Sequence, residues 1–302
     1  MGPSGVDADG WRHILVSRNF VQAAEELRGE FALFVKHLCI NKVDLTVTGT
    51  DVSSSLDAFL ACRLLPLDKC PGLRPIGVGE VLRRIASKVV MSVIKNDVQT
   101  SVGSLQVCAG QAGGCEAAIH AMHNIFDDAD TEAVLLIDAA NAFNSINRSN
   151  MLENIRKICP IAYTYAFNCY ATHARLCIVG GKSIKSKEGT TQGDPPSMAF
   201  YALGLLPLIW GISDAERSDS SVAYADDLTG AGKIGDLKHW FDSILDKGPL
   251  FGYYAEPTKS WLIVKDAHLD EAKTIFSDTA VNITTRGKKH LGAVIGHLDY
   301  KN

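Results

Sequence analysis

The chain has 302 residues, 46% of them hydrophobic and 21% charged, so it is long enough to form one large domain or two lobes around a real core. This balance, together with the lack of a low-complexity tract, excludes a disordered protein apart from the chain ends. The net charge of −4 provides no overall surplus of cations for phosphate contacts, which counts against a nucleic-acid enzyme.

The sequence carries no sign of a membrane or secreted protein. The long uncharged run over 195–213 contains three prolines and predicts a buried helix rather than a membrane span. No basic stretch followed by an apolar run opens the chain, so no secretory signal is expected. The eight cysteines form no CxxC pair, which favours reduced thiols. We therefore expect an intracellular protein with no membrane partner, in either the nucleus or the cytoplasm.

The first part of the chain predicts helices followed by a turn-rich basic stretch. After a loose lead-in over 1–19, residues 21–39 have apolar side chains at helical spacing and predict an amphipathic helix. The Thr, Ser and Asp content of 41–55 predicts a connector, and 56–67 is expected to pass from a short helix into an extended segment. Pro and Gly in 69–78 favour a hairpin or loop that reaches over a substrate.

Two further helices are predicted over 80–96 and 111–126. For the cations of the first helix, a solvated face and contact with a nucleic-acid backbone are both open. Two local basic clusters weaken the argument from net charge. The first includes the cations of this helix and consists of Lys69, Arg74, Arg83, Arg84 and Lys88, and the second consists of Arg286, Lys288 and Lys289.

The central part predicts a buried strand that ends in an acid. Residues 134–138 are a continuous apolar run of buried-strand type ending abruptly at Asp138. A helix over 149–158 with Ser149 as its N-cap is expected next. A strand over 175–179, closed by a turn at two glycines, and a helix over 199–212 follow it.

The last part predicts two short strands with an acidic turn between them. Residues 221–230 contain Asp226 and Asp227 where small and apolar residues lead in and out. A helix over 236–250 is then expected to pack on the sheet, with four large apolar side chains turned inward: Trp240, Phe241, Ile244 and Leu245.

Three carboxylates therefore belong to predicted core strands or their ends: Asp138, Asp226 and Asp227. Two adjacent carboxylates at a turn repel each other unless solvent or a cation relieves the repulsion, and Mg²⁺ prefers an oxygen-rich anionic pocket. For the acidic pair alone, a solvated turn is the plain alternative. With a third carboxylate at the end of a neighbouring strand, the group would make a two-metal phosphoryl-transfer site.

Three motifs, in this order and spacing, resemble the palm of reverse transcriptases, most like those encoded by retrotransposons. They are LIDAANAF over 136–143, EGTTQGDPPSM over 188–198 and AYADD over 223–227, and the resemblance runs from about Leu65 to about Gly296. It implies an α+β right-hand polymerase, with a palm of antiparallel sheet and packed helices and with N-terminal fingers. The expected parts are a helical lead-in over 1–55, fingers over 56–130 and a palm over 131–302.

The resemblance implies an RNA-directed DNA polymerase that transfers nucleotides from dNTPs to a primer 3′-hydroxyl on an RNA or DNA template. Asp138, Asp226 and Asp227 would bind two Mg²⁺ ions, with Mn²⁺ as a possible substitute. Lys259 matches a lysine near the leaving pyrophosphate, where it would donate a proton or stabilise charge. A solvated loop lysine is the alternative at that position.

Other positions would contact the nucleotide. Phe143 matches the residue that excludes a 2′-hydroxyl, although a core phenylalanine after a strand is the alternative. Lys69 and Arg74 look like the fingers residues that contact phosphates. At Gly193 a base pair could come close to the backbone, and Gln192 offers an amide to nucleotide or template.

Two positions depart from the pattern. Asn144 stands where many relatives have a second Asp, which leaves the expected ligands intact. Pro196 stands where relatives usually have an aliphatic residue, and it could shift the start of the next helix.

Residues 286–296 resemble the hairpin that grips the primer end, with Leu291-Gly292 at its core. Only six residues follow, so a thumb and any RNase H or integrase-like part are expected to be absent. The chain would then be a fragment, a degenerate product or one portion of a longer retroelement polyprotein. The alternative function is an inactive palm-fold relic that at most binds nucleic acid or partners. Another palm-type two-metal cyclase or polymerase would leave QGDPP and Phe143 unexplained.

Overall fold

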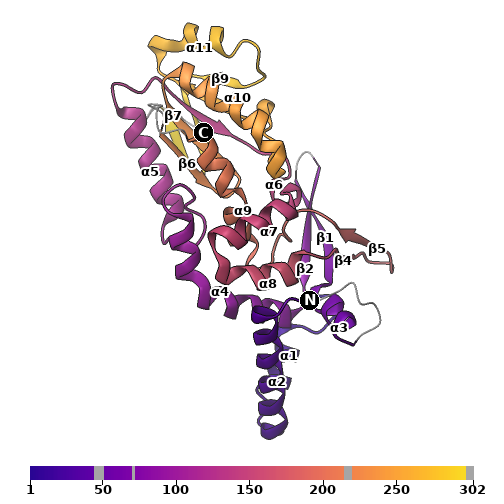
Figure 1. Ribbon diagram of the computed structural model, residues 1–302. Helices are drawn as coiled ribbons and strands as arrows, with labels where there is room; N and C mark the ends of the chain where they lie inside the picture. Colours follow the sequence, from indigo (N-terminus) through magenta and orange to yellow (C-terminus); the bar gives the residue numbers. More distant parts are fainter. Residues whose placement is uncertain (44–50, 70–71, 214–219, 297–302) are drawn as a thin grey trace. The chain divides into compact units, whose positions relative to one another are not determined.

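A computed structural model of the chain describes residues 1–43, 51–69, 72–213 and 220–296 (Figure 1). Its contacts form two compact units, Met1–Asp97 with Arg148–Phe200, and Val98–Asn147 with Tyr201–Asn302. Each unit is thus assembled from two separate stretches of sequence. Within the described ranges, no helix is both long and apolar enough to cross a membrane. The division at residues 55 and 130 stays a prediction.

The first unit combines helices with a four-stranded sheet of order β2-β1-β4-β5. The turn-rich basic stretch forms the expected hairpin, because β1 pairs antiparallel with β2 from Cys62↔Gly79 to Asp68↔Leu73. The elements of this unit, two of which continue into the second, are α1 (Ala8–Leu15), α2 (Val21–Ile40), α3 (Asp51–Leu60), β1 (Cys62–Asp68), β2 (Leu73–Gly79), α4 (Val81–Val102), α7 (Arg148–Ile158), α8 (Pro160–Tyr170), β4 (Ala174–Cys177), β5 (Ser183–Ser186) and α9 (Ser197–Ile212).

Several boundaries in this unit differ from expectation. The lead-in over 1–19 is not loose throughout, since it contains α1, and α4 continues past residue 96 to Val102. Part of the connector predicted over 41–55 is helical, since α3 begins at Asp51, while 44–50 lie outside the described residues. Ser149 is not the N-cap of α7, because the helix already begins at Arg148. The Arg148 backbone N–H donates to the Glu188 carboxylate at 2.8 Å. A side chain from a distant part of the sequence therefore serves this helix end, which a local capping pattern does not reveal.

Arg83 corrects the expectation of a solvated or nucleic-acid-binding position, because it is only 1% exposed. Its guanidinium Nη2 pairs with the Asp194 carboxylate at 2.5 Å, and its Nη1 donates to the Leu60 carbonyl at 2.7 Å. The Tyr170 hydroxyl donates to the same carboxylate at 3.2 Å. Helical periodicity favours a solvated arginine, and only a counter-ion far along the chain makes its burial tolerable.

The second unit is built on a five-stranded sheet of order β6-β7-β3-β8-β9, with β10 and β11 as a separate hairpin. The pairs among β6, β7, β3 and β8 are antiparallel as expected, whereas β8 and β9 run parallel. Its further elements are α5 (Gly114–Asp127), β3 (Ala133–Ile137), α6 (Ala142–Ser145), β6 (Ser220–Tyr224), β7 (Asp227–Gly232), α10 (Ile234–Phe251), η1 (Pro257–Lys259), β8 (Trp261–Val264), η2 (Asp266–His268), α11 (Leu269–Ile275), β9 (Asn282–Thr284), β10 (Gly287–His290) and β11 (Ala293–Gly296).

Helices cover both faces of this sheet, as Figure 1 shows for α5 and α10. On one face, Gly230 lets α10 approach, because a Cβ there would lie 3.0 Å from the Trp240 ring. On the other face, Val134 of β3 packs in one cluster with Phe126 of α5 and Ile295 of β11. Every residue of β3 is buried, so the continuous apolar run is the central strand that the sequence predicts.

The inner side of α10 is largely as predicted. Trp240, Phe241 and Ile244 are buried, whereas Leu245 is 40% exposed and does not turn inward. The buried face of α10 is centred on Leu237, Ile244 and Gly248, and because a helix advances about 100° per residue, Leu245 falls at the edge of that face. The hairpin expected over 286–296 is present as β10 and β11, and Leu291-Gly292, expected at its core, forms the connection between them with both residues at positive φ.

Replacing Arg83 with Met should lower the free energy of unfolding by about 3–5 kcal/mol, because it leaves the Asp194 carboxylate buried without its counter-ion. The matched control is Arg84→Met, since Arg84 is exposed on the same helix and its loss should change stability by about 0.5 kcal/mol or less. Denaturant unfolding of both variants measures the difference. Equal, small effects would contradict a structural role for the buried ion pair.

Candidate active site

The sheet of the second unit brings the three predicted aspartates together. β3 pairs with β7 from Ala133↔Gly232 to Ile137↔Leu228, and one further step in this register sets Asp138 opposite Asp227. Asp226 occupies the turn of the β6–β7 hairpin, which closes with the pair Tyr224↔Asp227. Residues far apart in the sequence thus meet at one end of the sheet, as expected from the apolar runs that lead to them.

The pKa values of two groups at this end of the sheet agree with this proximity. Burial, followed by the charges of Asp226 and Asp138, raises the pKa of Asp227 from 3.8 to about 7. Burial also raises the pKa of Tyr253 well above its ordinary value, and the charges of all three aspartates add to that effect. Without a cation, one of the three carboxylates therefore holds a proton near neutral pH.

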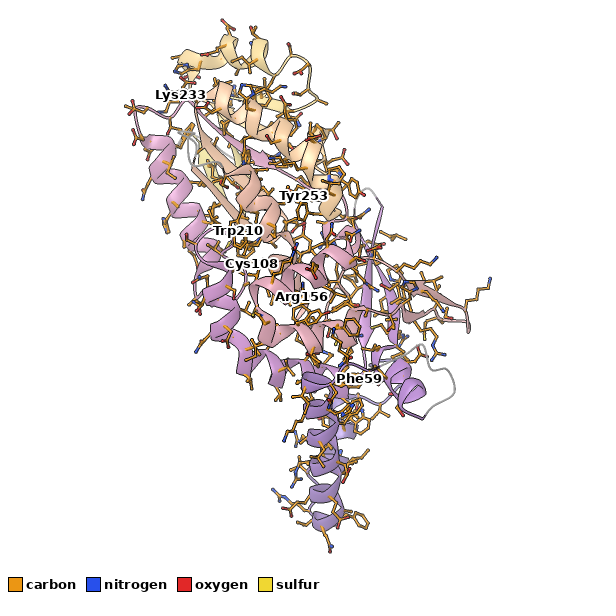
Figure 2. The ribbon with its side chains drawn as sticks, in the orientation of Figure 1. Phe59, Cys108, Arg156, Trp210, Lys233 and Tyr253 are labelled. Carbon is orange, nitrogen blue, oxygen red and sulfur yellow. The ribbon has the colours of Figure 1, made fainter. Side chains whose placement is uncertain are left out.

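The backbone of the acidic turn is held from two sides. Ala225 has φ +57°, a left-handed conformation that residues other than glycine rarely adopt. The buried amide of Gln106 bonds to Ala225, and the Tyr253 hydroxyl donates to the Asp226 carbonyl at 2.9 Å. Tyr253, labelled in Figure 2, lies just beyond the end of α10.

The segment before β8 holds the backbone of Asp138 in a similar way. The Asp138 N–H donates to the hydroxyl of buried Ser260 at 3.3 Å, and the Glu256 N–H donates to the Asp138 carbonyl at 2.8 Å. Lys259, in η1, lies in the same segment. Its side chain is 51% exposed, and its ammonium lies 3.7 Å from the Glu256 carboxylate. The ammonium of Lys259 therefore lies beside the Glu256 carboxylate in this structure.

Phe143 belongs to α6, the short helix that follows Asp138. Its half-buried ring stacks on Tyr201 with centroids 4.5 Å apart and planes 27° from parallel. Tyr201 is 1% exposed, and the charges of Asp226 and Asp227 contribute, after burial, to raising its pKa well above the ordinary value. Phe143 thus rests on a rigid aromatic base beside the acidic turn rather than within the core of the sheet.

The other predicted nucleotide contacts belong to the first unit. Lys69 and Arg74 are exposed on the β1–β2 hairpin, whose turn is closed by the Lys69 N–H donating to the Gly72 carbonyl at 3.0 Å. Gln192 is half-buried, and Gly193 is exposed at φ +100°. This φ favours glycine however much space surrounds the residue. The backbone conformation is therefore a reason for glycine at this position, in addition to the expected close approach of a base pair.

The loop that carries Gln192 and Gly193 is fixed by two buried arginines. Arg83 binds Asp194 on one side. Upstream, the guanidinium of Arg148 donates to the Gly189 carbonyl at 2.8 Å and to the Ser186 carbonyl at 2.7 Å. The loop therefore has its backbone fixed before any ligand arrives.

Sequence reasoning missed Gln106, Tyr253 and Ser260, the residues that hold the backbone around the aspartates. Gln106 lies in the stretch between two predicted helices, which received no assignment. The alternation of Leu105, Gln106 and Val107 is the local signal for an extended segment. Its pairing with the acidic turn had no signal, because the partners are 119 residues apart.

Known proteins resemble this chain in sequence and in fold. No protein-family model matches the chain. The 132 kDa protein of the retrotransposable element SLACS from Trypanosoma brucei gambiense is 24% identical over 243 residues, which cover 76% of this chain and 19% of that protein. The apo telomerase of Candida tropicalis superposes with a TM-score of 0.60 at 11% identity, covering 90% of this chain and 52% of that one. The same telomerase with a TWJ fragment of telomeric RNA gives 0.55 at 14% identity, covering 80% and 45%.

These likenesses define the chain as an α+β protein with the right-hand polymerase fold, which confirms the predicted fold class. The predicted resemblance to retrotransposon reverse transcriptases is confirmed by the relative from SLACS together with the telomerase fold. The chain spans 19% of the retrotransposon protein and about half of the telomerase chains.

The raised pKa of Asp227 predicts a pH-dependent stability in metal-free protein. The folded state holds this proton up to about pH 7, whereas the unfolded chain loses it near 3.8. The stability associated with the proton is therefore fully present below 3.8 and is lost as pH rises through 7. Asp227→Asn should raise Tm at pH 8 by at least about 2 °C relative to the unmutated protein, and by less at pH 5.

Thermal unfolding in EDTA at both pH values tests this. Asp270→Asn is the control, because the Asp270 side chain is fully exposed on α11. An Asp227→Asn effect that is the same at pH 5 and pH 8 would show that burial and the neighbouring carboxylates do not raise the pKa of Asp227 as inferred.

Proposed function

We propose that this chain is an RNA-directed DNA polymerase that transfers deoxynucleotides to a primer 3′-hydroxyl. The observation that carries the proposal is the meeting of Asp138, Asp226 and Asp227 at one end of the palm sheet. The relative from a retrotransposable element and the fold shared with telomerase support the same class of reaction.

The donor set fits divalent cations. Three carboxylates supply only oxygen ligands. Burial, with the charges of Asp226 and Asp138 adding to it, raises the pKa of Asp227, and positive charge that enters the group would favour the ionised carboxylate. Asp138, Asp226 and Asp227 would hold two Mg²⁺ ions, and Mn²⁺ would substitute. When bound, these ions would acidify the primer hydroxyl and neutralise charge on the triphosphate.

The chain's own side chains would select and orient the nucleotide. Phe143, backed by Tyr201, would stand against the sugar and reject a 2′-hydroxyl. Lys259 would move from Glu256 to the departing pyrophosphate and donate a proton or stabilise its charge. In the first unit, Lys69 and Arg74 would bind phosphates, and the fixed loop would present Gln192 and Gly193 to the nucleotide or template.

The partners follow from this reaction. They are an RNA or DNA template with its primer and the four dNTPs. Because the chain spans 19% of its SLACS relative, further domains of a retroelement polyprotein are proposed partners as well. One telomerase of this fold binds a TWJ fragment of telomeric RNA, which supports nucleic acid as the ligand of the fold.

Primer extension on an RNA template should require Mg²⁺ and should stop when EDTA removes it. Asp226→Asn should lower the rate by at least about 100-fold, because it removes a metal ligand rather than an outer partner. Asp270→Asn, at a fully exposed position of the same unit, should leave the rate unchanged.

Extension by Asp226→Asn at the unmutated rate would disprove the assignment of the site. If the unmutated protein binds primer and template but never extends, the chain is instead the inactive palm-fold relic. Circular dichroism of each variant confirms that the fold persists, as expected for a change at a partly exposed ligand.

Phe143→Ala should lower the preference for dNTPs over rNTPs by about 10- to 100-fold, because it removes the ring that blocks a 2′-hydroxyl. Single-nucleotide incorporation with each substrate measures the ratio. Phe167→Ala in α8 controls for the loss of an aromatic ring elsewhere. An unchanged ratio in an active Phe143→Ala enzyme would assign the phenylalanine to packing alone.

A further inference from the structure

A short extended segment between α4 and α5 is attached to the edge of the palm sheet just before the acidic turn. Gln106 forms a parallel bridge with Ala223 of β6. The Ala223 N–H donates to the Leu105 carbonyl at 2.8 Å, and the Val107 N–H donates to the Ala223 carbonyl at 2.9 Å. These two bonds fix the backbone of Gln106 beside Ala223, which lies two positions before Ala225 in the sequence.

The start of α5 holds this segment from the other side. A Cβ at Gly114 would lie 2.0 Å from the Val107 carbonyl oxygen, so the helix backbone lies directly against the segment. Gln106 is 0% exposed. Its backbone is therefore held by β6 and α5, independently of the bonds that its side chain makes to the turn.

This amide binds both polar groups of one residue. Gln106 Oε1 accepts the Ala225 N–H at 2.8 Å, and Gln106 Nε2 donates to the Ala225 carbonyl at 3.1 Å. Ala225 is the residue at φ +57°. Its conformation sets the direction in which the chain leaves β6 and enters Asp226 and Asp227, so it controls where both carboxylates point.

We propose that Gln106 is a positioning residue that keeps Ala225 left-handed and thereby orients Asp226 and Asp227 for binding a divalent cation. The identity of that cation rests on the proposed function, whereas the clamp itself rests on the contacts of Gln106. Tyr253 holds the next carbonyl, that of Asp226, so the turn is secured at consecutive peptide groups.

Only a primary amide on a side chain of this length can perform this task. Glutamate would accept from the Ala225 N–H but, when ionised, would offer no donor to the carbonyl. Methionine matches glutamine in length but leaves both groups of Ala225 buried without that partner. Glycine at position 225 would adopt the left-handed conformation unaided.

These differences define a rescue experiment with Mn²⁺ alone as the probe, in the absence of nucleic acid. The Kd for Mn²⁺ is measured by electron paramagnetic resonance, and the site is identified by its loss in Asp226→Asn. Gln106→Met should weaken this site by about tenfold, and Gln106→Glu should weaken it less. Adding Ala225→Gly to Gln106→Met should recover at least about threefold of the loss, because glycine no longer needs the clamp.

Gln111→Met is the matched control. Gln111 lies in the same connecting stretch and bonds to Gln99 and Gly103 instead of the acidic turn, so its loss should leave the Mn²⁺ Kd unchanged. Thermal unfolding separates a folded variant with weak binding from a misfolded one. If Gln106→Met does not fold, Gln106→Glu with and without Ala225→Gly provides the same comparison.

A folded Gln106 variant with the unmutated Kd overturns the inference, as does a double variant in which glycine recovers nothing. Absence of any Asp226-dependent Mn²⁺ site in the unmutated protein overturns it as well. An unmutated protein that binds Mn²⁺ in this way but extends no primer disproves the polymerase activity and leaves the inference to be decided by the Kd values.

Discussion

The antiparallel pairing of β3 with β7 is the constraint on which the site depends. A slip of one residue in this register would turn every side chain of β3 to the opposite face, and the two faces have different partners: Trp240 of α10 lies against Gly230 on one, and Val134 packs with Phe126 of α5 on the other. The apolar core therefore enforces the register, and the register in turn holds Asp138 opposite Asp227. Burial, with the charges of Asp226 and Asp138 adding to it, raises the pKa of Asp227, and the stability of the sheet offsets the cost of ionising this carboxyl there.

Both units fix polar loops through partners that are distant in sequence. In the second unit, Gln106, Tyr253 and Ser260 bond to the backbone beside the acidic residues. In the first unit, Arg83 and Arg148 hold the two ends of the loop that carries Gln192 and Gly193. The backbone of these loops is therefore already hydrogen-bonded within the protein. This fixed backbone positions the partly exposed side chains that the loops carry, although those side chains are not rigid themselves.

Features with a local cause were predictable from the sequence. The apolar run that ends at Asp138, the small residues around the acidic turn and the two glycines at 180 and 181 each led to the correct element. Three of the errors or omissions have non-local causes. Arg83 is buried by a partner 111 residues away, the start of α7 is served by Glu188, and Gln106 gains its meaning only from a strand that follows much later. Periodicity and capping rules contain no information about such partners.

The buried pairing of Arg83 with Asp194 also bears on how this sequence can drift over evolutionary time. A change at either position alone passes through an uncompensated charge in the interior, which selection for folding would remove. The two sites are therefore free to vary only as a couple, by near-simultaneous replacement with another matched pair or with two apolar residues. Among distant descendants of this chain, the residues at positions 83 and 194 should change together.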